Sequence, residues 1–124
     1  GSEAFLIEED RVLLTGDACN NFTFLFEDYS LSIREYRDNL IQFREQVKGL
    51  FDTVLSSHGD GILPVNIIEE VEDVCTDILR GNTDEIPFRF RGTDGLIAKA
   101  TAGMGQPRLD GKYGNIVYSY NRII

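Results

Sequence analysis

Cysteine and histidine supply much of the nucleophilic, redox and metal chemistry of proteins, and this chain has Cys19, Cys75 and His58. They lie far apart and outside any C-x-x-C pattern, so they lack the spacing of a structural zinc site. Both cysteines stand among apolar residues, where a thiol usually acts as a small buried hydrophobe. We therefore expect no metal site, no disulfide scaffold, and a reduced, cytoplasmic setting.

Carboxylates are abundant, but their placement is typical of solvation. Acid–base catalysis needs two carboxylates, or a histidine and a carboxylate, that converge in a pocket. Five acidic residues instead lie mostly on the water-facing side of one predicted helix: Glu69, Glu70, Glu72, Asp73 and Asp77. No nucleophile elbow or phosphate-binding loop is evident. We expect that the chain is not an enzyme and has no catalytic residues.

Composition indicates a single globular domain over residues 3–124, since Gly1-Ser2 resembles the remnant of a cleaved expression tag. Hydrophobic residues make up 42% and charged residues 27% of the 124 residues. No apolar run reaches the roughly 20 residues of a membrane helix, so we expect no membrane contact. The net charge is -9, with 19 acidic and 6 basic side chains in residues 1–86, which excludes nucleic acid as a favoured partner.

The first half of the chain predicts a hairpin and a long helix. Two apolar segments, 4–7 and 12–15, flank a charged turn, and residues 18–26 suggest short helical turns. Ser32 and Glu35 have the spacing of a capping box, which predicts that a helix begins there and runs to about Ser56.

Apolar residues in this long helix recur at alternating gaps of three and four. The series is Ile33, Tyr36, Leu40, Phe43, Val47, Leu50 and Val54. Such a seam is typical of coiled-coil-like contacts, so we expect a homodimer with Ile33, Leu40, Val47 and Val54 at its interface. The alternative is that the stripe covers a sheet of the same chain.

The second half predicts an amphipathic helix and three strands. Asn66 and Glu69 have capping-box spacing, and Gly81 ends the helix. Residues 86–91 alternate as a strand, and Thr93-Asp94-Gly95 has the composition of a hairpin turn. Strands over 96–100 and 115–123 complete a predicted antiparallel meander.

This order of elements resembles a PAS domain, a sensory module with a five-stranded antiparallel sheet and flanking helices. The matching segments are Thr15-Gly16-Asp17-Ala18-Cys19, the run from Phe88 to Gly95, and Asp110-Gly111-Lys112 followed by Ile116-Val117. The resemblance implies an α+β fold, here with an unusually long central helix. The family's Asp-Ile-Thr motif after the last strand is replaced by Arg122-Ile123-Ile124.

The resemblance also implies an interior cavity. Small side chains at Ala98 and Ala100 would leave space beside aromatic residues, although the aromatics could equally fill it. The residues expected to bind a ligand are Cys75, Ile78, Phe88, Phe90, Ala98, Ala100, Ile116, Tyr118 and Tyr120. A flavin adduct is not expected because Cys19 precedes the family's reactive position, and His58 lies before the helix that would carry a haem ligand. The cofactor is thus left unassigned.

These features predict a signal-transduction domain that binds a small ligand or dimerises to regulate an output domain elsewhere in a longer chain. Two alternatives stay open. One is an enzyme or small-molecule-binding protein with a cone-shaped fold resembling ketosteroid isomerase, with Asp17 or Asp94 as a base if it is an enzyme. The other is a purely structural interaction module held by the helix seam.

Overall fold

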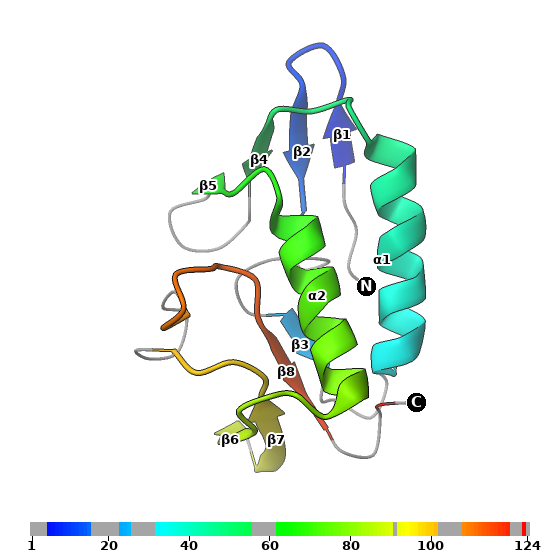
Figure 1. Ribbon diagram of the computed structural model, residues 1–124. Coiled ribbons are helices and arrows are strands. Elements are labelled where there is room, and N and C mark those ends of the chain that lie inside the picture. The colour runs from blue at the N-terminus through cyan, green and yellow to red at the C-terminus, as the bar shows by residue number, and fades with distance from the viewer. Residues whose placement is uncertain are drawn as a thin grey trace.

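The chain folds as an α+β protein with two helices and two sheets, as the sequence predicts (Figure 1). The computed structural model describes residues 5–15, 23–25, 32–55, 62–90, 92–101, 108–119 and 123. One sheet lies at the top of Figure 1 and the other at the bottom, with α1 at the right of the view and α2 descending in the centre to the level of β8. Within the described ranges, neither helix has the length and apolar composition needed to cross a bilayer.

The first sheet contains β1 (Phe5–Ile7), β2 (Val12–Leu14), β4 (Thr53–Leu55) and β5 (Ile62–Leu63), in the order β1-β2-β4-β5. The predicted opening hairpin is confirmed, because β1 and β2 pair antiparallel. Strand β4 lies parallel to β2, and α1 is part of the connection between them.

The second sheet contains β3 (Thr23–Leu25), β8 (Ile116–Tyr118), β7 (Thr93–Ile97) and β6 (Ile86–Phe90), in the order β3-β8-β7-β6. The predicted meander of the last three strands is confirmed by the antiparallel pairs β6–β7 and β7–β8. Strand β3 adds to β8 in parallel, within a segment for which the sequence suggested helical turns.

Helix α1 (Ile33–Val47) begins where the sequence predicts. The Ser32 side chain accepts a hydrogen bond from the Glu35 amide at 3.2 Å, and the Glu35 carboxylate accepts one from the Ser32 amide at 3.2 Å. Helix α2 (Ile67–Arg80) ends at Gly81, whose φ of +75° is the left-handed conformation expected of a glycine stop. The second capping box does not form, because the Asn66 side chain makes no capping hydrogen bond.

One hydrophobic core joins the two helices to both sheets. Helix α1 contributes Ile33, Tyr36 and Leu40, and α2 contributes a continuous apolar face that includes Val71 and Cys75. The first sheet adds Leu13 and Val54, and the second adds Ile116 and Tyr118. In this packing the C-terminal end of α1 lies near the N-terminal end of α2.

The five-stranded antiparallel sheet implied by the PAS resemblance is wrong. The described strands form two four-stranded sheets, and each contains one parallel pair. Parallel pairs join segments that are distant in the sequence, so no local turn signal announces them. The order of hairpin, helix and meander is therefore compatible with more than one sheet arrangement.

The long central helix over 32–56 is also wrong, because α1 ends at Val47. Lys48 leaves helical geometry with φ -54° and ψ 125°, and Gly49 has φ +75°. The stripe continues past this point because alternation in β4 buries Val54 between two half-buried neighbours. Val54 of β4 therefore matches the helical spacing of α1 only by coincidence.

The turn between β6 and β7 comes earlier than the sequence suggests. Phe90 pairs with Thr93, so the chain reverses between them, and Gly92 has φ +81°. Asp94 and Gly95 lie inside β7 instead of at the turn. A glycine that takes a positive φ two residues before Asp94 supplies the tight turn in place of Asp-Gly.

Candidate ligand-binding pocket

The residues predicted to line an interior cavity mostly fill the core. Cys75, Ile78, Ala98, Ile116 and Tyr118 are all buried in the main hydrophobic cluster, none more than 4% exposed. These five side chains therefore serve packing between α2 and the second sheet.

Phe88, which was predicted to face the same cavity, lies on the opposite face of the second sheet. It packs with Ile97 and Val117, whereas Ile116 and Tyr118 belong to the main core. The register explains this separation, because Phe88 pairs with Gly95 and Ile97 pairs with Val117, which gives these residues one face.

The remaining predicted ligand residues do not complete a cavity. Ala100 is half-buried, and its amide donates to the Asp84 carboxylate at 2.7 Å. The side chain of Phe90 and the whole of Tyr120 lie outside the described residues. The predicted set is thus divided between core, opposite face and loop.

The predicted dimer seam is used inside the chain. Ile33, Leu40 and Val47 are buried in the main cluster, and α1 packs along α2. Val54 is fully buried in β4. The stripe therefore covers the chain's own interior, which was the alternative that the sequence left open, and these side chains are not on the surface.

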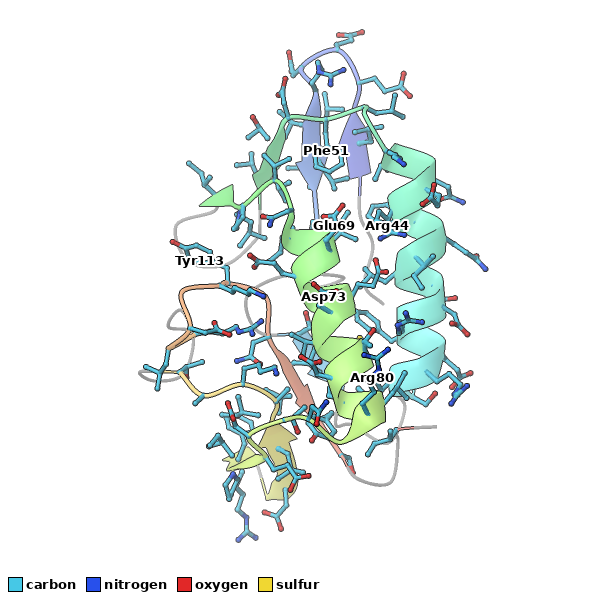
Figure 2. The ribbon with its side chains drawn as sticks, viewed as in Figure 1. Arg44, Phe51, Glu69, Asp73, Arg80 and Tyr113 are labelled. Carbon is cyan, nitrogen blue, oxygen red and sulfur yellow. The ribbon has the colours of Figure 1, made fainter. Side chains whose placement is uncertain are left out.

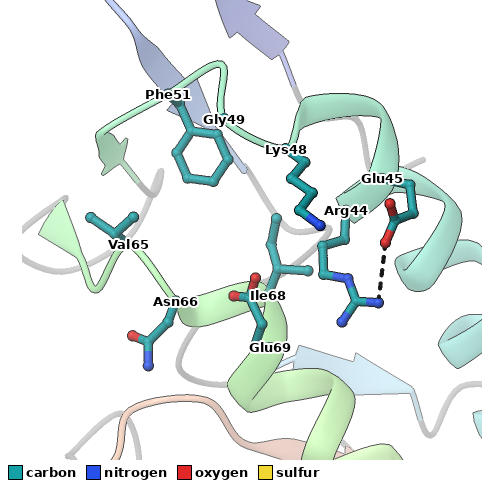
Figure 3. A pocket seen from close by; sticks show the side chains of 9 residues that line it. All are labelled: Arg44, Glu45, Lys48, Gly49, Phe51, Val65, Asn66, Ile68 and Glu69. Carbon is teal, nitrogen blue, oxygen red and sulfur yellow. Dashed lines mark hydrogen bonds and ion pairs between the residues drawn. The ribbon is translucent and has the colours of Figure 1, made fainter.

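A pocket of about 520 Å³ opens where the end of α1 meets the start of α2 (Figure 3). Its apolar wall comes from Phe51, in the connection to β4, and from Val65 and Ile68 at the start of α2. Ile68 is buried, whereas Val65 is 51% exposed. Ligand sites are typically concave and mainly apolar with a few polar groups, whereas this pocket has more charged and polar lining residues than apolar ones.

Four charged side chains also line the pocket, namely Arg44, Glu45, Lys48 and Glu69, and Gly49 and Asn66 complete the lining. Arg44 is already engaged, because it contacts Glu72 at 2.8 Å and Glu45 at 3.4 Å. Figure 2 shows Arg44 and Glu69 on the facing sides of α1 and α2, with Phe51 above them. The described residues include no hydrogen-bond or ion-pair partner for the side chain of Lys48 or Glu69.

The buried thiol of Cys75 is expected to be unreactive. Burial raises its pKa to about 12, and the nearby Arg37 guanidinium opposes this rise only in part. Because the thiolate is the nucleophile, a pKa this high leaves the thiol inert near neutral pH. Cys19 and His58 lie outside the described residues.

The other ionisable groups show no convergent arrangement. Asp94, the alternative catalytic base, is exposed and pairs with Arg89 at 3.5 Å, while Asp17 lies outside the described residues. Burial raises the pKa of Tyr118, whose hydroxyl shares a 3.0 Å hydrogen bond with Thr83. No three His, Cys, Asp or Glu residues cluster as a metal site within the ranges that the structure describes.

Sequence reasoning missed this pocket because two segments that are separated in the sequence, 44–51 and 65–69, form it. Lys48-Gly49 was the available signal, since a lysine followed by glycine often marks a helix end. No protein-family model matches the chain, and comparison with curated proteins and with solved structures finds no significant match.

Proposed function

We propose that the chain is a non-catalytic regulatory domain that binds a small ligand between the end of α1 and the start of α2. The observation that carries this proposal is the 520 Å³ pocket, which combines an apolar wall with two charged side chains, Lys48 and Glu69, that have no partner among the described residues. Ligand binding at the junction of two helices would change how they pack, and such a change can be passed to an output domain elsewhere in a longer chain.

Two features of the described residues support binding over catalysis. The thiol of Cys75 has a pKa of about 12, which disfavours a nucleophilic role. The pocket's most enclosed basic group, Arg44, is held by Glu72 and Glu45, so it serves as a scaffold between the helices. Membership of the PAS family stays a prediction, and the proposal does not depend on it.

Dimerisation also stays a prediction, but it would need a surface other than the helix seam. Ile33, Leu40 and Val47 hold the domain together, so a second copy could reach them only if the core opened. The ligand-binding proposal requires no such opening.

The proposal is tested by fragment binding to ¹⁵N-labelled protein. Small fragments with one ring or branched chain and one polar group should shift the amide signals of Phe51, Val65 and Ile68. A Val65→Trp variant should lose these shifts, because an indole would fill the pocket from a half-exposed position.

Ile62→Trp is the matched control, since Ile62 is 72% exposed and does not line the pocket. It should bind fragments as the parent protein does. Fragment binding that survives in Val65→Trp, or a complete lack of binding in the parent protein, would contradict the proposal.

A further inference from the structure

We propose that the pocket recognises a zwitterion, namely a free α-amino acid with a branched aliphatic or aromatic side chain. The inference rests on the proposed ligand-binding function and specifies its ligand. It follows from how charge and apolar surface are divided among the described residues of the lining.

The pocket has one unpaired charge of each sign. Arg44 is neutralised by Glu72 at 2.8 Å and by Glu45 at 3.4 Å. Lys48 and Glu69 remain, and neither side chain has a partner among the described residues. A ligand therefore meets one free ammonium group and one free carboxylate.

These two charges come from different walls. Lys48 follows the last turn of α1, whereas Glu69 lies in the first turn of α2. They are not within the 4.0 Å of an ion pair, although both line the same pocket. A ligand carboxylate can pair with Lys48 and a ligand ammonium with Glu69 without breaking an existing contact.

Charge balance disfavours ligands with a single charge. The four charged lining residues sum to zero, and the whole chain carries -9. An anion would meet Glu69 at the site and be repelled by the field of the chain, and a cation would meet Lys48 at the site. A zwitterion satisfies both unpaired groups and carries no net charge.

The apolar wall accounts for the side chain of the ligand. Phe51, Val65 and Ile68 line the pocket beside the charged pair, as Figure 3 shows. Burial of a branched or aromatic group against these residues would remove apolar surface from water on both partners. Small polar amino acids would lose this contribution.

The test measures amide shifts during titration with four related compounds. L-leucine carries both charges, 3-methylbutan-1-amine only the ammonium, 4-methylpentanoate only the carboxylate, and N-acetyl-L-leucinamide neither. We expect L-leucine to bind up to about fivefold more tightly than either singly charged compound, the effect of one solvent-accessible ion pair, and more tightly still than N-acetyl-L-leucinamide.

Variants assign the two charges. Lys48→Gln should weaken the binding of L-leucine about fivefold and leave that of 3-methylbutan-1-amine unchanged. Glu69→Gln should likewise weaken the binding of L-leucine, but it should leave that of 4-methylpentanoate unchanged. The control variants Lys112→Gln and Asp38→Asn remove exposed charges outside the pocket and should change neither affinity.

The outcomes separate this inference from the proposed function. If neutral fragments shift Phe51 and Val65 but L-leucine binds no better than N-acetyl-L-leucinamide, the zwitterion inference is wrong and the binding function stands. If no compound shifts any pocket residue, both are wrong. Equal effects of Lys48→Gln on all four compounds would likewise overturn the assignment of the carboxylate to Lys48.

Discussion

Gly114→Ala should destabilise the protein because Gly114 lies directly against α2. A β-carbon at this position would come within 2.9 Å of Val71 Cγ2 and 3.0 Å of the Val71 amide nitrogen. The Glu70 carboxylate also accepts hydrogen bonds from the Tyr113 and Gly114 amides, each at 2.9 Å. Relief of the clash would move this loop away from α2 and stretch both bonds.

The magnitude follows from three terms. Overpacking of a close contact costs about 1–3 kcal/mol. A hydrogen bond to a charged group contributes about 1.5–3 kcal/mol, of which a stretched bond loses part. The lower chain entropy of unfolded alanine offsets about 0.4–1 kcal/mol. We expect a net loss of about 2–4 kcal/mol in the free energy of unfolding.

Urea denaturation followed by circular dichroism measures this change, provided that the m-value is unaltered. Gly111→Ala is the control, since a β-carbon added at Gly111 would meet no atom within 4 Å. Gly111 has φ +88°, so only backbone strain of about 1–2 kcal/mol is expected. In the double variant with Val71→Ala, the total loss of unfolding free energy should be smaller than the sum of the losses in the two single variants, because the nearest contact of the new methyl group is gone. A Gly114→Ala protein as stable as the parent would refute the reasoning.

Three further predictions concern the core and the helix ends. In a Cys19→Ser background, Cys75 should resist iodoacetamide at pH 8, because its pKa of about 12 instead of 9.0 makes the native thiolate population roughly a thousandfold smaller. Because the thiol ionises in the unfolded chain near pH 9.0 but in the folded protein only near pH 12, the free energy of unfolding should fall as pH rises between these values. A Cys75→Ala variant should lack this contribution. Ser32→Ala should cost about 1 kcal/mol in urea denaturation and Asn66→Ala less than about 0.5, since only Ser32 caps its helix; equal costs would contradict this. Leu40→Glu should unfold the chain, because it places a charge in the core, and circular dichroism would detect the loss of structure. A variant that stays folded and is monomeric by light scattering would instead support the predicted dimer seam.

The sequence predicted elements whose signals are local. The Ser32–Glu35 box, the Gly81 stop and the alternation of Ile116, Val117 and Tyr118 each act within a few residues, and all three are confirmed. Strand β3 was missed because its partner β8 lies near the other end of the chain. Pairings of this kind are decided by tertiary packing, which a single sequence does not display.

The site was missed for a related reason. The spacing of apolar residues ran without a break from α1 through Leu50 to Val54, so it concealed the turn at Lys48 and Gly49 that creates the pocket. The interior positions were recognised as apolar, but the pairing of Phe90 with Thr93 puts Phe88 on the face of Ile97 and Val117, away from Tyr118. The observed register thus divides the predicted cavity between the two faces of the second sheet.

A crystallographic fragment screen tests the central claim most directly, because it places ligands without assuming where they bind. The account predicts density against Phe51 and Ile68, between the end of α1 and the start of α2. Fragments found instead among Cys75, Ala98 and Tyr118, with the helix junction empty, would contradict it.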